Sequence, residues 1–213
     1  MTQWSEGTGL GRQRGPVGLV RAWGGILARP RTFFREQVAP GDQAPGLTFA
    51  AVVVLATELI RISLVADAYP VVAGRPAASA VLWVLFVVVL VAPAGIHLTA
   101  ALQTVILMGT VPDRAGVSET VQVLCYAMAP CVLIGIPDPW VRAAAALWGA
   151  GLAVVGVAEV HNVHPGTALV VAAIPAFLIF GYGFGGYEAT VTVWETVARV
   201  AGLPAPLLFP GTG

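Results

Sequence analysis

The chain has 213 residues, of which 57% are apolar and only 10% are charged. Because soluble domains carry about 25% charged residues, this composition excludes an ordinary water-soluble domain and indicates an integral membrane protein. Its 11 basic residues, all arginine, balance 11 acidic residues.

Residues 1–46 are predicted to form a basic, amphipathic, cytoplasmic arm, of which the glycine-rich residues 1–15 are expected to be disordered. From Pro16 onward, apolar residues recur along one face of a helix. The aromatic and cationic residues of the arm are Arg21, Trp23, Arg29, Arg31, Phe33, Phe34 and Arg35. Such a helix suits the headgroup plane of a bilayer, where guanidinium groups pair with anionic phosphates. The alternative is a cytosolic segment packed on the loops. The arm is too short and too aromatic to predict nucleic-acid binding.

Residues 47–186 are predicted to form an all-α membrane bundle of five transmembrane helices. The expected spans cover approximately residues 47–66, 80–108, 121–137, 141–161 and 167–185. The second span exceeds the thickness of the bilayer, and Pro93 and Gly95 predict a kink within it.

Spans three and four are predicted to form a tight hairpin at the centre of the bundle. No charged residue lies between Glu119 and Asp138, and only Arg142 stands at the start of the second run. Both runs are otherwise apolar on all sides, as lipid-embedded helices are. Pro137 ends one helix and Pro139 starts the next. In span four, small residues recur every four positions at Ala145, Gly149 and Ala153. This stripe predicts close helix packing and offers a surface for a second copy.

Residues 187–213 are predicted to be a tail with a short interfacial helix followed by a proline-rich coil. Five spans place the two termini on opposite sides. With the N-terminus inside, seven arginines are cytoplasmic and three are external, which obeys the positive-inside rule. We therefore expect a multi-pass protein of the cell membrane with a cytoplasmic N-terminus.

Three ionisable residues lie within the first two predicted spans and are candidates for an intramembrane polar cluster: Glu58, Arg61 and His97. Glu58 and Arg61 are three residues apart and therefore share a helical face. One interpretation is a proton or ion relay; the other is a salt-bridged staple that fixes helix packing.

Enzymatic signatures are missing from the sequence. It contains no Gly-x-Ser-x-Gly, His-Glu-x-x-His, phosphate-binding loop or dinucleotide fingerprint. Glu159, His161 and His164 have metal-ligand side chains, but they lie in a loop without an obvious further ligand. We therefore predict no enzyme activity, no cofactor and no metal site.

Proline, glycine and aromatic residues recur in a characteristic order along the apolar helices. They include the segment 29–34 and the residues Tyr126, Pro130, Pro137, Trp148, Gly156 and Pro175. In this order and spacing the chain resembles the Yip domain family, named for Ypt-interacting proteins. The resemblance covers most of residues 20–185 and implies five spans with a cytosolic N-terminus.

Eukaryotic members of that family are implicated in vesicle trafficking and bind Rab-type GTPases, whereas prokaryotic members have no settled activity. This chain lacks the long N-terminal region of the eukaryotic proteins, so the trafficking role is not carried over. Its composition, free of lysine and rich in alanine, valine and glycine, favours a bacterial or archaeal source.

Two functions are expected from these patterns. The first is a non-enzymatic, membrane-organising or protein-recruiting scaffold, whose arm contacts anionic lipid headgroups and whose spans contact other membrane proteins or a second copy. The second is a small transporter or channel-like subunit that uses the polar cluster.

Overall fold

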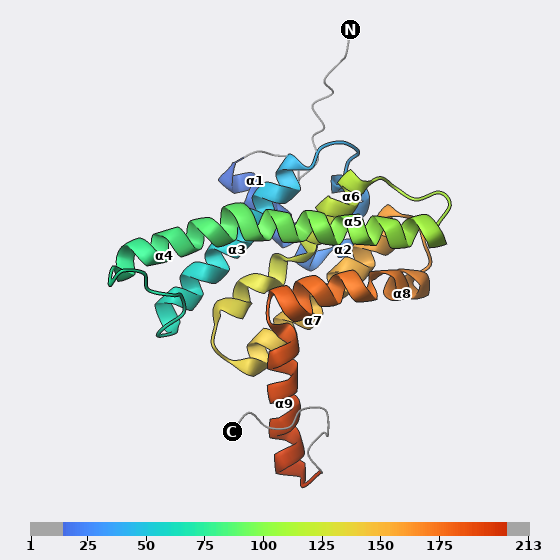
Figure 1. The fold of residues 1–213 in the computed structure, drawn as a ribbon. Helices are drawn as coiled ribbons and strands as arrows, with labels where there is room; N and C mark the ends of the chain where they lie inside the picture. The colour runs from blue at the N-terminus through green and yellow to red at the C-terminus, as the bar shows by residue number, and fades with distance from the viewer. Residues whose placement is uncertain (1–14, 204–213) are drawn as a thin grey trace.

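The computed structural model describes residues 15–203, which fold into helices joined by short loops with no β-strand in that range (Figure 1). The α-helices are α1 (Pro16–Ala28), α2 (Pro30–Gln37), α3 (Ala44–Leu64), α4 (Pro76–Leu85), α5 (Ala92–Thr110), α6 (Val117–Ala127), α7 (Pro139–Val160), α8 (Pro165–Ala176) and α9 (Gly186–Ala201). Three further turns are the π-helices η1 (Phe86–Val91) and η3 (Phe177–Gly183) and the 3₁₀-helix η2 (Ala129–Gly135). The predicted all-α bundle is confirmed, while the first 14 residues of the arm and residues 204–213 of the tail lie outside the described range.

Proline sets where many of these helices begin. Five α-helices start directly on a proline, and α3 has one at its second position. The first helical N–H groups have no partner within the helix, so a residue that lacks an N–H and has a fixed φ is well suited there. At α7 the Asp138 carboxylate also accepts a hydrogen bond from the Val141 N–H (2.9 Å).

Four helices of the described chain are long and apolar enough to cross a membrane. They are α3, the continuous helix α4–η1–α5 (Pro76–Thr110), α7, and α8–η3 (Pro165–Gly183). A fifth is obtained if α6 and η2, which are bent by 44°, are counted as one span. The predicted five spans therefore correspond to the count that includes this bent pair.

The third span changes direction at Pro130. This proline is the second residue of η2 and has no N–H to continue the α-helical hydrogen bonds of α6. Side chains of neighbouring helices bond to carbonyls of η2 on both sides of this proline: the Trp23 Nε1–H donates to Ala129 O (2.8 Å), and the Thr57 hydroxyl donates to Cys131 O (3.1 Å). Protein side chains thus satisfy part of the irregular backbone, as a non-helical segment within a membrane span requires.

The second span accommodates Pro93 without a break. A π-helical turn precedes the proline, in which the Ala92 N–H donates to the carbonyl of Val87, five residues back. Such a turn widens the helix at the position where the proline ring would otherwise clash. The predicted kink lies at Pro93 and Gly95, and the structure has this π-helical turn directly before them, in a helix that continues as one span to Thr110 (Figure 1).

The arm packs against the bundle through its apolar side chains. Phe34 and Ile26 are fully buried, and Phe33 stacks edge-on against Tyr126 with ring centroids 4.9 Å apart. Trp23 and Phe49 extend the same aromatic cluster, at 5.2 Å from each other. The aromatic residues of the arm therefore face protein, where the sequence had suggested lipid headgroups. Aromatic pairs of this geometry gain stability beyond the area that they bury.

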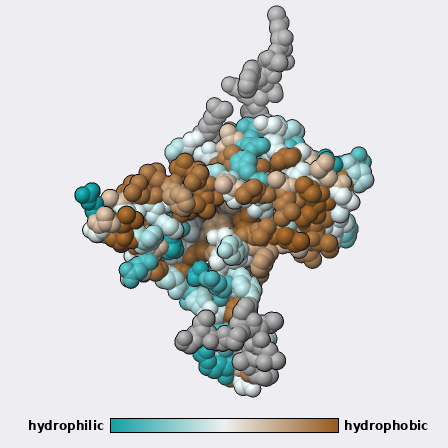
Figure 2. All heavy atoms as spheres, in the orientation of Figure 1, coloured by the Kyte–Doolittle hydropathy of each residue, from teal (hydrophilic) through white to brown (hydrophobic). Residues whose placement is uncertain are grey.

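The outer surface of the long helix is apolar. Val81, Val89, Leu98 and Val105 along α4–η1–α5 are exposed. Figure 2 shows this hydrophobic surface over the middle of the molecule, whereas hydrophilic residues gather toward its extremities. A contiguous apolar surface of this extent is typical of contact with lipid.

Helix α9 begins after Gly185, whose positive φ of 68° turns the chain away from η3. In Figure 1 this helix projects from the body of the bundle. It matches the short helix predicted for the tail, but it is an α-helix of 16 residues.

Candidate functional site

Close helix packing at Gly156 holds the arm in place. A Cβ atom at this position would lie 2.6 Å from Val123 Cγ1 of α6 and 2.9 Å from the ring of Phe34 in α2. Only glycine allows three helices to approach so closely. The family-like residue Gly156 therefore joins α7 both to the buried third span and to the arm.

The guanidinium groups of the arm stay at the surface while its rings are buried. Arg31 and Arg35 of α2 share the carboxylate of Glu159 near the end of α7: Arg35 Nη2 lies 2.5 Å and Arg31 Nε 3.9 Å from it. The hydrogen bond to Glu159 and its charge raise the pKa of Arg35. Arg21 in α1 and Arg29, the C-cap residue of α1, are also exposed. Glu36 also acts on Arg35, so two carboxylates balance Arg31 and Arg35, and Arg21 and Arg29 add further positive charge to this edge of the protein.

Glu159, His161 and His164 each have separate partners. The imidazole of His161 is buried, with Nε2 3.3 Å from the Thr120 hydroxyl. Burial, and to a lesser extent the charge of Arg114, lower the pKa of His161 to about 4, so the ring is neutral at pH 7. His164 Nδ1 accepts from the Gly166 N–H (3.1 Å) and caps α8. Within residues 15–203 no three histidine, cysteine or acidic side chains are grouped as metal ligands.

The intramembrane cluster contains two of its three predicted members. Arg61 Nη2 donates to Glu58 Oε2 at 2.6 Å. Trp83 of α4 completes the cluster, because its Nε1–H donates to the same carboxylate oxygen (2.9 Å) and Arg61 lies 5.9 Å from its ring centroid. His97 lies elsewhere: its ring is exposed, and Nδ1 donates to the carbonyl of Pro93 (2.7 Å).

Trp83 was not singled out from the sequence. The signal available was a tryptophan in the first turns of the span that follows Glu58, since a buried or membrane-embedded indole N–H requires an acceptor. Which acceptor it meets depends on how two helices are rotated, and that is not a local property of the chain.

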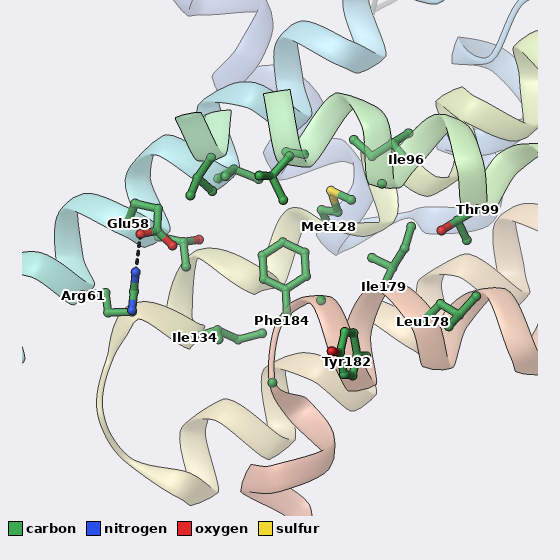
Figure 3. A pocket seen from close by; sticks show the side chains of 18 of the residues that line it. Glu58, Arg61, Ile96, Thr99, Met128, Ile134, Leu178, Ile179, Tyr182 and Phe184 are labelled. Carbon is green, nitrogen blue, oxygen red and sulfur yellow. Dashed lines mark hydrogen bonds and ion pairs between the residues drawn. The ribbon is translucent and has the colours of Figure 1, made fainter. Parts of the chain in front are cut away.

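A cavity of about 610 Å³ lies beside the Glu58–Arg61 pair. It is open on one side and is lined by α3, the α4–η1–α5 helix, η2, the first turn of α7, the end of η3 and the start of α9. Figure 3 shows Phe184 projecting into the space between Glu58 and Met128, with Ile179 and Tyr182 beside it. The volume falls within the range of about 300–1,000 Å³ typical of small-molecule sites.

The small-residue stripe of span four is used inside the chain. Ala145, Gly149 and Ala153 are all buried. A Cβ on Gly149 would lie 2.6 Å from the ring of Phe180 in η3 and 3.2 Å from the carbonyl of Ala127. The stripe therefore brings α7 close to η3 and α6, and it is not exposed to a second copy.

The remaining family-like residues occupy different environments. Tyr126 is buried in the aromatic cluster, and Pro130 marks the bend of the third span. Pro137 is exposed in the loop before α7, and Trp148 is half-exposed on its outer face. Pro175 is buried inside α8, just before the π-helical turn.

Comparison with known families assigns most of the chain to one of them. The family model of the Yip1 domain matches residues 24–187, from α1 to the start of α9. The chain belongs to the Yip1 domain family. Neither a curated protein nor a solved structure matches it. Membership of this family and the apolar spans together identify an integral, multi-pass membrane protein. The match does not bear out the bacterial or archaeal source that the composition suggested.

Proposed function

We propose that this Yip-family protein is a non-enzymatic scaffold of the cell membrane, which organises the membrane or recruits proteins through its arm. The observation that carries the proposal is the division of the arm into two faces. Its rings pack against Tyr126 and Gly156, while Arg21, Arg29 and Arg35 remain exposed. A rigidly held cationic edge binds anionic surfaces without first losing the conformational entropy of a free segment.

The arrangement of arginines supports a cytoplasmic position for the arm. Seven arginines fall on its side of a five-span topology and three on the other side. Anionic lipids of the cytoplasmic leaflet attract basic residues near the surface, each contributing about 1 kcal/mol. Acidic patches of partner proteins present the same chemistry.

The experiment compares arginine variants in nanodiscs of neutral phosphatidylcholine. The test variant replaces the four exposed arginines of the arm with glutamine: Arg21, Arg29, Arg31 and Arg35. The control replaces Arg75 and Arg199, which are also exposed but are predicted to lie on the other side. Co-flotation with vesicles that contain phosphatidylglycerol measures binding, and the protease accessibility of a terminal tag in sealed membrane vesicles from the expression host measures orientation.

We expect the test variant to lose at least about tenfold in vesicle affinity at low salt, and the control to keep it. Unchanged binding and unchanged orientation of the test variant would reject the role of the arm.

A transporter or channel-like subunit is the second candidate, and the cavity beside Glu58 favours it. A relay would need a proton-accepting chain, but His97 is outside the cluster and Glu58 is held by Arg61 and Trp83. Flux through proteoliposomes that is lost on Glu58→Gln would support this candidate. Flux that survives both Glu58→Gln and His97→Ala would argue against it.

A further inference from the structure

Arg142 has no ionic partner within the described chain. It lies in the first turn of α7, and its side chain reaches Gly185, where a Cβ atom would be only 2.7 Å from Nη2. Its Nε atom is buried without a hydrogen-bond partner, and the guanidinium forms no ion pair with residues 15–203. Arg61, in contrast, is neutralised by Glu58. A partly buried cation without a counter-ion is costly unless a ligand supplies one.

The guanidinium of Arg142 lines the same cavity as the Glu58–Arg61 pair. The interior walls are apolar: Val54, Val87, Ile96, Met128, Ile134 and Ile179. The rim is polar, and it carries Trp83 on one side and Arg142 with Glu188 on the other. Figure 3 shows the apolar side chains Ile96, Met128, Ile179 and Leu178 on the side of the cavity away from Arg61.

The depth of these groups in the membrane follows from their places in the spans. Arg142 begins α7, Gly185 follows the end of η3, and Trp83 lies in the first turns of the second span. Arg142 and Gly185 therefore lie near the ends of spans, at the level of the headgroups. Trp83 and Thr57 each lie about two turns further in, and Ile96 lies deeper still. This rim is at the opposite end of α7 from Glu159 and the arm.

We propose that the cavity binds an anionic phospholipid, with its phosphate paired to Arg142 and one acyl chain along the apolar wall. Charge complementarity favours this occupant. The two arginines and two glutamates of the lining balance in number, but Glu58 is paired with Arg61 and Glu188 is exposed. The partly buried charge that is left for a ligand is therefore the guanidinium of Arg142. Guanidinium groups form strong, charge-assisted hydrogen bonds with phosphate. The proposal does not depend on the function of the arm.

Native mass spectrometry of the full-length protein, released from detergent, tests the site. The probes are phosphatidylglycerol, phosphatidylcholine with the same acyl chains, and free glycerol phosphate as a competitor. Arg142→Gln removes the charge and Arg142→Lys keeps it. Gly95→Leu fills the cavity: Gly95 lies in its wall, and a Cβ there meets no atom within 4 Å. Gly151→Leu is the matched control, since Gly151 has the same free space on a span but does not line the cavity.

We expect the wild-type protein to retain phosphatidylglycerol in preference to phosphatidylcholine. Arg142→Gln should weaken that binding by at least about tenfold, Arg142→Lys should weaken it less, and Gly95→Leu should weaken it comparably. Gly151→Leu should bind as the wild type does, and glycerol phosphate should not compete.

Equal retention of the two lipids by the wild type would overturn the proposal. Undiminished phosphatidylglycerol binding by Gly95→Leu, or full competition by glycerol phosphate, would overturn it as well. Circular dichroism establishes that each variant is folded. If Arg142→Gln does not fold, Gly95→Leu and the competition experiment still decide the outcome.

Discussion

Substitution of Gly156 by alanine tests the contact of three helices on which the position of the arm depends. The added methyl group would lie 2.6 Å from Val123 Cγ1 and 2.9 Å from Phe34. Favourable carbon–carbon contacts require about 3.5–4.0 Å, so α7 must move by roughly 1 Å or the neighbours must leave their rotamers. Overpacking of this kind costs about 1–3 kcal/mol of the free energy of unfolding.

Two native cysteines provide the assay. Cys125 and Cys131 are free and fully buried, so a thiol-reactive fluorogenic dye reports their exposure when the protein is heated in detergent. Each kcal/mol lowers the unfolding temperature of a chain of this size by about 2–4 °C. We therefore expect Gly156→Ala to lower it by roughly 2–12 °C. Gly151→Ala is the control, because its methyl group meets no atom within 4 Å.

Equal unfolding temperatures of Gly156→Ala and Gly151→Ala would refute the reasoning. A double variant gives a second check, since Val123→Ala removes the nearest atom of the predicted clash. The double variant Gly156→Ala/Val123→Ala should lose less free energy of unfolding than the losses of the two single variants added together, by about 0.5–3 kcal/mol. Strict additivity would mean that the two side chains do not touch.

Three further predictions follow from individual residues. Cys125 and Cys131 should resist a membrane-permeant maleimide in the folded protein and react fully after unfolding, as a mass shift would reveal; rapid native labelling would contradict their burial. Glu58→Gln should lower the free energy of unfolding by about 1–2 kcal/mol, less than the 3–5 kcal/mol of a fully buried pair because the Arg61 side chain is 31% exposed; a thermal melt as stable as that of the wild type would contradict this. His161 has a folded-state pKa of about 4, below its ordinary value of 6.5, so the unfolded chain binds the proton first as the pH falls. The free energy of unfolding should be highest above pH 6.5 and fall by up to about 3 kcal/mol toward pH 4. In melts followed by circular dichroism, His161→Gln should remove this part of the loss. An identical pH profile for this variant would show that the ring does not titrate as described.

The helical elements could be predicted from the sequence because their signals are local. The apolar runs, the prolines at helix starts and the pairing of Glu58 with Arg61 across one helical turn depend on residues that are near one another in the chain. The bend of the third span was not predicted, although Pro130 was noted. Whether a proline bends a helix depends on the groups that bond to the irregular backbone around it, and here these are Trp23 and Thr57, which come from two other helices.

The candidate sites were predicted less completely than the helices. His97 was expected beside Glu58, but its ring lies at the surface and bonds to the carbonyl of Pro93. Trp83 takes the place in the cluster, and Arg142, which seemed only to start a span, lines the cavity. These positions depend on the relative rotation and depth of packed helices.

By itself the sequence determined that this protein is a bundle of apolar helices suited to lipid, since hydrophobicity and proline chemistry act over a few residues. It also determined the excess of arginine at the N-terminal end. Only the tertiary structure decided that the rings of the arm are buried against Tyr126, that the small-residue stripe packs inside the chain, and that Arg142 is left without a counter-ion. The reason is physical: a side chain's partner is set by which helix faces it, and that is fixed only when all the helices pack together.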